Sequence, residues 1–350
     1  MKIHFAYAIP RFQSSYLKRG FSKYLILSGR VPTLPILYRR GWLPFLPNPL
    51  RAPYSITVNL FRYLKERATT YLYDWEEQRT VKIGDGGIIL GHPHPNPNTI
   101  VQQAFNNGIA FKRKILIFPI HHAIESIGRF TLPLIEKADI VFGIMGQYWY
   151  ETLDNSMYSC WKEKIIPLDM AIDAKQYPVV KKRFNKPGKR GYLYIGGNRP
   201  EKGCHILNET MAGLGNLPKG WIGEGPDIPH MKHVSRWADL TPGFMSAIAE
   251  KYDFFINTSI SDANPTTILE AMAWGFPVAC TPQSGYHNMP SVTTLSTADI
   301  AKNIEDLLEL QYMQEEKLLE ISAINRSLVE TNYTWERFCN SIWKEIKVFS

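Results

Sequence analysis

The stretch S-I-S-D-A-N-P-T-T-I-L-E-A-M-A-W-G-F-P-V-A-C-T-P-Q-S-G, residues 259–285, decides how we interpret the whole chain. An apolar run of strand length, residues 253–258, precedes it. Asn264 is placed to cap a helix that begins at Pro265, a residue without a backbone N–H, and Gly275 ends this helix. A second short strand follows at once. Because the loop between a strand and a helix N-terminus suits an anion, the stretch predicts a phosphate site there.

Two carboxylates lie in this stretch. Asp262 is in the loop, and Glu270 is in the second turn of the helix, eight residues later. Both side chains can face one pocket. The pair also fits simpler roles, in which Glu270 is a solvated helix residue and Asp262 is a cap.

The stretch resembles the E-x7-E signature of retaining glycosyltransferases of family 4. Glu270 stands at the second glutamate, and residues 269–273 with Gly275 match the helix of the signature. Asp262 stands where the family usually has Glu, which keeps the charge and shortens the side chain by one methylene. The resemblance implies an α/β protein of GT-B architecture, with two Rossmann-like, doubly wound parallel-sheet domains that face a cleft. The second domain would hold the donor nucleotide.

Two glycine-rich segments precede this stretch. The segment I-G-G-N-R-P-E-K-G, residues 195–203, follows an apolar run, and its glycines and cations suit a diphosphate. It resembles the first donor loop of the family, G-R-x-x-x-x-K-G, with matches at Gly196, Lys202 and Gly203. Gly197 replaces the family arginine, and Arg199 either reaches the same phosphate or lies at the surface.

The second glycine-rich segment is W-I-G-E-G-P, residues 221–226. It resembles the G-D/E-G-P turn that ends a strand near the nucleotide in the family. The residues expected on the donor side are Gly223, Glu224 and Gly225. A tight turn without a ligand would use the same residues. The resemblance therefore depends on the order in which all three motifs occur along the chain.

The resemblance assigns roles to these residues. Glu270 would hold the ribose hydroxyls, Asp262 would contact the sugar hydroxyls, and Lys202 would stabilise the departing diphosphate, with help from Arg199. Backbone groups near the helix start would lie close to sugar or phosphate, at Asn264, Pro265, Thr266 and Thr267. The donor would be a UDP-sugar or a GDP-sugar, transferred with retention. We expect no cofactor and no metal, because no Asp-x-Asp pair stands in a donor-site position.

The first half carries a group of histidines. His121, in F-P-I-H-H at residues 118–122, matches a family histidine that contacts the donor sugar, so we expect it to be catalytic together with Asp262 and Lys202. A packed core histidine is the alternative. His92 and His94 follow another strand and can line the same cleft. A metal cluster formed with His122 is a further alternative, although no carboxylate or thiol has a fixed spacing to these histidines.

The chain has 350 residues, enough for two domains with cores, and alternating apolar runs and helical segments predict parallel sheets. Residues 1–168 would form the acceptor domain, with an insertion at about 10–54. Residues 178–332 would form the donor domain, and residues 333–350 a closing helix that crosses back. The four cysteines lack metal or disulfide spacing and are expected to be reduced.

Charge is concentrated at the start of the chain. The first 70 residues hold twelve Lys and Arg against one acid, Glu66, a net +11 against +8 for the whole chain. The insertion is also rich in proline and aromatic residues, which predicts docking on an anionic membrane surface, or else an arm packed on its own domain. Nowhere do eighteen apolar residues run together. We therefore expect a cytoplasmic protein, or one attached peripherally to the cytoplasmic face of a membrane.

The leading hypothesis is a glycosyltransferase that moves sugar from a nucleoside-diphosphate sugar to a lipid-linked or polysaccharide acceptor at the membrane surface. The alternative is a catalytically weak protein of the same fold that binds sugar nucleotides or serves as a scaffold. Nucleic-acid binding through the basic first 70 residues is disfavoured, because no recognition motif accompanies the charge.

Overall fold

The computed structural model describes residues 1–9, 52–77, 86–107, 111–236 and 241–348. Most of the insertion predicted at about 10–54 lies outside the described residues. The chain divides into two compact units. Unit 1 comprises Met1–Ile144, Leu153–Leu168 and Trp335–Ser350, and unit 2 comprises Met145–Thr152 and Asp169–Thr334.

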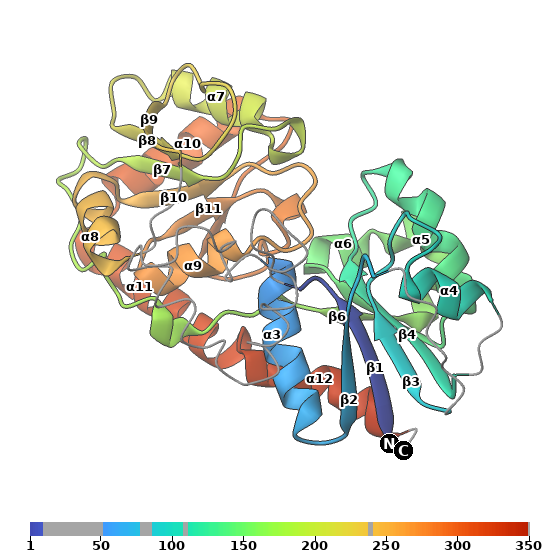
Figure 1. The fold of residues 1–350 in the computed structure, drawn as a ribbon. Coiled ribbons are helices and arrows are strands. Elements are labelled where there is room, and N and C mark those ends of the chain that lie inside the picture. Colours follow the sequence, from blue (N-terminus) through green and yellow to red (C-terminus); the bar gives the residue numbers. More distant parts are fainter. Residues whose placement is uncertain (10–51, 78–85, 108–110, 237–240, 349–350) are drawn as a thin grey trace. The chain divides into compact units, whose positions relative to one another are not determined.

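Unit 1 is built on a parallel six-stranded sheet with the order β2-β1-β3-β4-β5-β6 (Figure 1). The strands are β1 (Lys2–Tyr7), β2 (Thr69–Asp74), β3 (Ile88–Gly91), β4 (Arg113–Pro119), β5 (Ile140–Ile144) and β6 (Ile165–Leu168). Its helices are α3 (Ala52–Lys65), α4 (Ile100–Asn106), α5 (Glu125–Lys137) and α12 (Trp335–Lys347), and α12 packs against α3.

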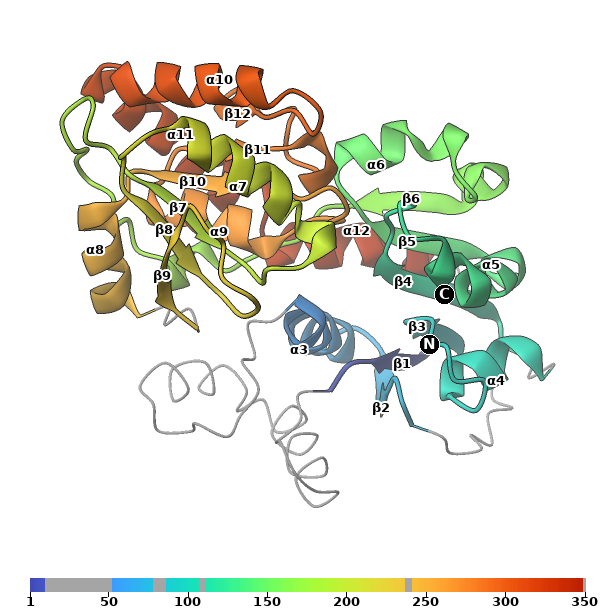
Figure 2. The same cartoon turned by 90° about the horizontal axis from the view of Figure 1, so that it is seen from above.

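Unit 2 has a second parallel six-stranded sheet, with the order β12-β11-β10-β7-β8-β9. The strands are β7 (Tyr192–Ile195), β8 (Lys219–Ile222), β9 (Lys232–Ser235), β10 (Phe254–Asn257), β11 (Val278–Cys280) and β12 (Val292–Thr294). Its helices are α6 (Gln147–Glu151), α7 (Cys204–Gly213), α8 (Pro242–Lys251), α9 (Thr266–Trp274), α10 (Ile300–Tyr312) and α11 (Glu315–Asn332). Helices α7 and α10 cover one face of the sheet, and α9 and α11 cover the other (Figures 1 and 2).

Helices on both faces explain the apolar strands. Every residue of β10 and β11 is buried, as expected for parallel strands covered on two sides. The core of unit 2 includes Trp221, Phe254 and Leu307. The prediction of a doubly wound α/β protein with two parallel sheets is confirmed, and the cleft between the two domains stays a prediction.

Each sheet has one point where the strand order reverses. In unit 1 the chain passes from β1 to β2 on one side and then returns to β3 on the other side of β1. In unit 2 it passes from β7 through β8 and β9 and returns to β10 on the other side of β7. Such reversals leave a crevice at the carboxyl ends of the two central strands, where ligands bind in open α/β sheets.

Some local predictions differ from the structure. Residues 165–168 form β6, a strand that the sequence does not predict. Helix α3 begins at Ala52, within the insertion predicted at about 10–54, and Pro53 is compatible with its first turn. The eight residues Met145–Thr152 lie with unit 2, although the strands before and after them belong to unit 1.

A buried ion pair between Lys181 and Asp253 fixes the segment before β7 within unit 2. Lys181 and Asp253 are only 3% and 0% exposed, and the Lys181 Nζ lies 2.6 Å from the Asp253 carboxylate. The ammonium also donates to the Ala249 carbonyl at 2.6 Å. The carboxylate accepts from the backbone N–H groups of Asn185 at 2.9 Å and Gly191 at 2.8 Å. The pair is therefore buried with its hydrogen bonds made.

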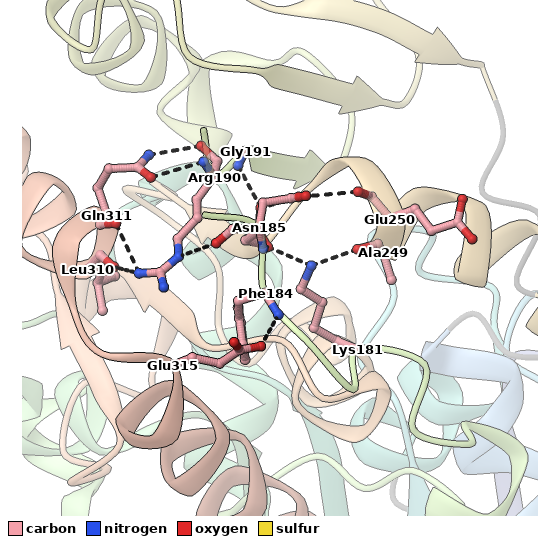
Figure 3. A network of polar contacts seen from close by, with 11 residues as sticks. Lys181, Phe184, Asn185, Arg190, Gly191, Ala249, Glu250, Leu310, Gln311 and Glu315 are labelled. Atoms are coloured by element: carbon pink, nitrogen blue, oxygen red, sulfur yellow. Dashed lines mark hydrogen bonds and ion pairs between the residues drawn. The ribbon is translucent and has the colours of Figure 1, made fainter. Parts of the chain in front are cut away.

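Arg190 extends this network to the end of α10 (Figure 3). Its Nη1 donates to the carbonyls of Gln311 at 2.9 Å and Met313 at 2.6 Å. The Gln311 side-chain amide in turn donates to the Arg190 carbonyl at 2.9 Å. These bonds satisfy the carbonyls that a helix leaves unpaired at its C-terminus.

Candidate functional site

A lysine and an aspartate meet at the strand reversal of unit 2. Lys202 ends the 3-10 turn after β7, and Asp262 lies in the loop after β10. The Lys202 ammonium is paired with the Asp262 carboxylate, and the two side chains are 28% and 18% exposed. A cation and a carboxylate, both open in part to solvent, therefore stand together where the fold places ligands.

The backbone segments that precede Asp262 and surround Lys202 are in direct contact. Gly203 adopts a φ of +61°, and a Cβ at this position would lie 1.9 Å from the Thr258 carbonyl oxygen. The Thr258 hydroxyl donates to the Gly203 carbonyl at 3.0 Å. The N–H groups of Ile260 and Ser261 donate to the Glu201 carbonyl at 3.1 Å. Position 203 therefore requires glycine, because the backbone is left-handed there and a side chain would collide with the Thr258 carbonyl.

Substitution of Gly203 by Ala is expected to destabilise unit 2 by about 2–4 kcal/mol, since a left-handed residue gains a side chain where backbone already lies. Gly188 is the matched control, because its φ is +79° and a Cβ there would meet nothing within 4 Å. Gly188→Ala should cost only about 1 kcal/mol. Denaturant unfolding of the two variants checks this, and equal losses would contradict the packing argument.

The two glycine-rich motifs also come together. Asn198 donates to the Glu224 carbonyl from its N–H at 2.8 Å, and to the Pro226 carbonyl from its side chain at 2.8 Å. A Cβ on Gly223 would lie 1.9 Å from the Gly196 carbonyl oxygen. The loop after β7 and the turn after β8 thus form one continuous backbone surface.

Arg199 and Glu224 lie nearer the surface than Lys202. Arg199 is exposed at the start of the 3-10 turn. The Glu224 carboxylate pairs with Arg236 at 3.0 Å, and the Arg236 side chain is 70% exposed. A Cβ at Gly197 would lie 3.4 Å from the Arg199 Nε, an ordinary van der Waals contact.

Two buried aromatic residues support the glycine loop and were missed at the sequence level. The Tyr194 hydroxyl donates to the Gly197 carbonyl at 3.1 Å, and the Trp221 Nε1 donates to the Gly196 carbonyl at 2.8 Å. Both side chains are at most 1% exposed. Burial raises the pKa of the Tyr194 hydroxyl, so this group stays a donor. Both belong to apolar strands, so the sequence indicated only core packing.

Asn264 is not the helix cap that the sequence predicts. The residue before α9 is Pro265, and the Asn264 Oδ1 accepts from the Met170 N–H at 2.7 Å and the Tyr286 hydroxyl at 2.6 Å. These partners are distant in sequence and take the oxygen that a cap would use. Within the described part of the chain, the buried Asn264 amide nitrogen has no hydrogen-bond partner.

Helix α9 presents its first turn at the same loop. Thr266 and Thr267 are its first two residues, half-buried, and their N–H groups precede the first intrahelical bond. Glu270 is 8% exposed, and its carboxylate accepts from the Tyr177 hydroxyl at 3.4 Å. Glu270 is thus not a solvated helix residue, and its predicted contact with ribose stays a prediction.

No protein-family model matches this sequence, and no curated protein does. Among solved structures it is similar to a glycosyltransferase from Rickettsia africae, with 12% identity, a TM-score of 0.60 and coverage of 86% of this chain and 95% of that one. It is also similar to a UDP-forming α,α-trehalose-phosphate synthase from Burkholderia xenovorans, with 10% identity, a TM-score of 0.58, and coverage of 74% and 73%. The chain has the GT-B fold.

A third GT-B structure is a mutant of S. aureus TarM in complex with fondaparinux, alpha-GlcNAc-glycerol and UDP. The identity is 15%, the TM-score is 0.54, and the match covers 75% of this chain. This chain spans about half the length of TarM, with 55% of it covered. The likeness establishes the fold, and the local geometry must carry any function.

Helix α6 adds a contact that the GT-B resemblance did not predict. The Trp149 Nε1 donates to the carbonyls of Asp262 at 3.1 Å and Gln283 at 2.9 Å. The Gly146 N–H donates to the Ala263 carbonyl at 2.8 Å. The loop that carries Asp262 is therefore held by α6 from one side and by the loop after β7 from the other.

The histidines of unit 1 follow two of its strands. His121 and His122 are half-buried and are separated from the end of β4 by Ile120, and burial lowers the pKa of His122. The catalytic role of His121 stays a prediction. His92 follows β3, and burial lowers its pKa to about 4. In the described ranges no group of three His, Cys, Asp or Glu is placed to hold a metal ion.

The stability of the chain is expected to fall as pH drops from about 6.5 to about 4. In this window the unfolded chain protonates His92 and the folded ring stays neutral, so the loss is at most about 1.4 kcal/mol per pH unit. Denaturant midpoints at pH 7, 6 and 5 measure it. The loss of stability should be smaller in His92→Phe and unchanged in the exposed control His205→Gln. Equal slopes of stability against pH in the native protein and both variants would refute the role of His92.

Proposed function

We propose that this chain is a retaining glycosyltransferase that uses a nucleoside-diphosphate sugar as donor. The observation that carries the proposal is the pairing of Lys202 with Asp262 at the strand reversal of unit 2. Phosphates need a cation, and sugar hydroxyls need an acceptor beside it. A sugar diphosphate presents both groups next to each other.

The proposed division of roles follows the chemistry of transfer. The bond between the anomeric carbon and the diphosphate oxygen breaks, and its electron pair leaves with the nucleoside diphosphate. Lys202 and the N-terminus of α9 stabilise that growing negative charge. Asp262 accepts hydrogen bonds from the sugar, and Glu270 from the ribose. The acceptor oxygen then bonds to the anomeric carbon on the face that the leaving group vacates, and its proton passes to the departing diphosphate oxygen.

Backbone groups complete the proposed donor site. The glycine loop after β7 and the N–H groups of Thr266 and Thr267 offer donors without side chains in the way. The TarM complex contains UDP, and the trehalose-phosphate synthase is UDP-forming. These relatives favour a UDP-sugar over a GDP-sugar as the first donor to try.

The proposed acceptor is a lipid-linked or polysaccharide glycan. Among helices of the described residues, none is long and apolar enough to cross a membrane. Basic and aromatic residues in the sequence at 10–54 favour attachment to an anionic membrane surface from the cytoplasmic side. Deletion of this segment should lower binding to phosphatidylserine vesicles and leave donor binding intact.

A screen of nucleotide sugars tests the proposed function. UDP-glucose, UDP-N-acetylglucosamine and GDP-mannose are compared with UDP and GDP alone by thermal shift. A donor at about 100 times its Kd adds about 2.7 kcal/mol of stability. Release of nucleoside diphosphate is then measured. Binding without release would support the alternative of a binding protein, and no shift with any nucleotide would refute a donor site.

A further inference from the structure

The carboxyl edge of the sheet in unit 1 carries an aromatic cluster. His92, which follows β3, has its ring 4.7 Å from that of Trp75, 5.3 Å from that of Tyr7 and 6.3 Å from that of Phe118, all in edge-to-face contact. Tyr7 ends β1, and Trp75 follows β2. The cluster therefore spans β2, β1, β3 and β4, which are neighbours in the sheet.

This cluster lies at the strand reversal of unit 1. The reversal falls between β1 and β3, which end at Tyr7 and Gly91. The carboxyl ends at such a reversal are where open α/β sheets bind ligands. Trp75 and His92 are both half-buried, so each keeps some surface for a ligand.

The backbone around His92 fixes which nitrogen carries the proton. Its Nδ1 lies 2.5 Å from the Pro93 carbonyl oxygen. A carbonyl can only accept, so the hydrogen is on Nδ1 and the Nε2 of the neutral ring is an acceptor. Because burial lowers the pKa of His92 to about 4, this neutral form holds at neutral pH.

In His94 the donor and acceptor nitrogens of the ring are exchanged relative to those of His92. The Asn96 N–H donates to its Nδ1 at 3.1 Å, so the neutral ring of His94 carries its hydrogen on Nε2. The His94 ring lies 6.2 Å from the Trp75 ring. The rings of His92, with an acceptor nitrogen, and of His94, with a donor nitrogen, therefore both lie near the Trp75 ring.

These features select an uncharged ligand that is rich in hydroxyl groups. A hydroxyl can donate to one imidazole and accept from another, and the indole offers an apolar face for the C–H side of a ring. Within the described residues, the neutral His92 supplies no positive charge for a phosphate.

We propose that Trp75, His92 and His94 bind a neutral sugar ring of the acceptor. The proposal rests on the glycosyltransferase function above and adds the acceptor site within unit 1. A glycan chain and a lipid-linked sugar share this chemistry. In both cases a sugar ring packs on Trp75, one hydroxyl donates to His92, and another accepts from His94.

Calorimetric titration of the full chain with methyl glycosides of glucose, galactose, mannose and N-acetylglucosamine tests the site. At least one should bind, and both Trp75→Ala and His92→Leu should weaken it at least tenfold. His92→Gln should recover part of the affinity, since its amide oxygen can accept. His205→Gln is the exposed control. An octyl glycoside that binds more tightly than its methyl counterpart would indicate a lipid-linked source, and equal affinity a glycan chain.

UDP is titrated in parallel to separate this site from the donor site. Its affinity should be the same in all variants, because these residues belong to unit 1. Absence of glycoside binding, or unchanged affinity in Trp75→Ala and His92→Leu, would overturn the sugar site even if UDP binds. Absence of UDP binding would count against the proposed function instead. If Trp75→Ala does not fold, the comparison of His92→Leu with His92→Gln decides the question.

Discussion

Replacement of Lys202 by Ala is expected to lower sugar transfer by about 10²–10³-fold, the usual effect of removing one group that stabilises charge in the transition state. In the structure the Lys202 ammonium is held beside the Asp262 carboxylate, with 28% of the lysine side chain exposed. A donor diphosphate would therefore find this cation already in place. Steady-state kinetics with the donor found by thermal shift measures the loss.

The effect should fall mainly on kcat, because the charge on the leaving group grows as the bond breaks. Lys202→Arg should recover part of the rate, since it retains the charge. Lys186→Ala is the matched control, as an exposed lysine of the same unit. Full turnover by a folded Lys202→Ala protein would remove Lys202 from the mechanism.

Replacement of Lys181 by Met should destabilise unit 2 by about 3–5 kcal/mol, the range observed when one partner of a buried ion pair is removed. The change leaves the Asp253 carboxylate charged, 0% exposed and without its cation. Burial lowers the pKa of Lys181, while Asp253 opposes this shift, so each charge depends on the other. For a unit of this size the melting temperature should fall by roughly 10 °C.

Two further variants separate charge from packing in this pair. Lys182→Met is the control, since Lys182 is exposed and adjacent in sequence. Asp253→Asn in the Lys181→Met background should restore part of the stability, because it removes the uncompensated charge while an amide oxygen still accepts hydrogen bonds. Equal melting temperatures for Lys181→Met and Lys182→Met would show that the buried pair contributes nothing.

Local patterns were enough to predict several parts of the structure. The strand at residues 278–280 and the helix ending at Gly275 appear as predicted, because apolar runs and a left-handed glycine are local signals. Gly203 was also expected to belong to a loop whose glycines and cations suit a diphosphate. Its contact with Thr258 required knowing that β10 pairs with β7, which no local pattern states.

Tertiary contacts explain what was missed. Asn264 has the residue type and position of a cap, yet Met170 and Tyr286 compete for its oxygen. Trp149 lies 113 residues before Asp262, so nothing in its own neighbourhood marks it as part of the site. Residues 165–168 form a strand of four residues, too short to show an alternating or a helical pattern.

The placement of Met145–Thr152 with unit 2 has a practical consequence for dissecting this enzyme candidate. A fragment that starts at Asp169 would look like a natural domain, yet it would lack Trp149 and leave the carbonyls of Asp262 and Gln283 without their indole donor. Weak nucleotide affinity in such a truncation would report the missing helix and not the native protein. Expression of unit 2 without residues 145–152 therefore calls for α6 to be supplied, by fusion through a linker or as a separate peptide.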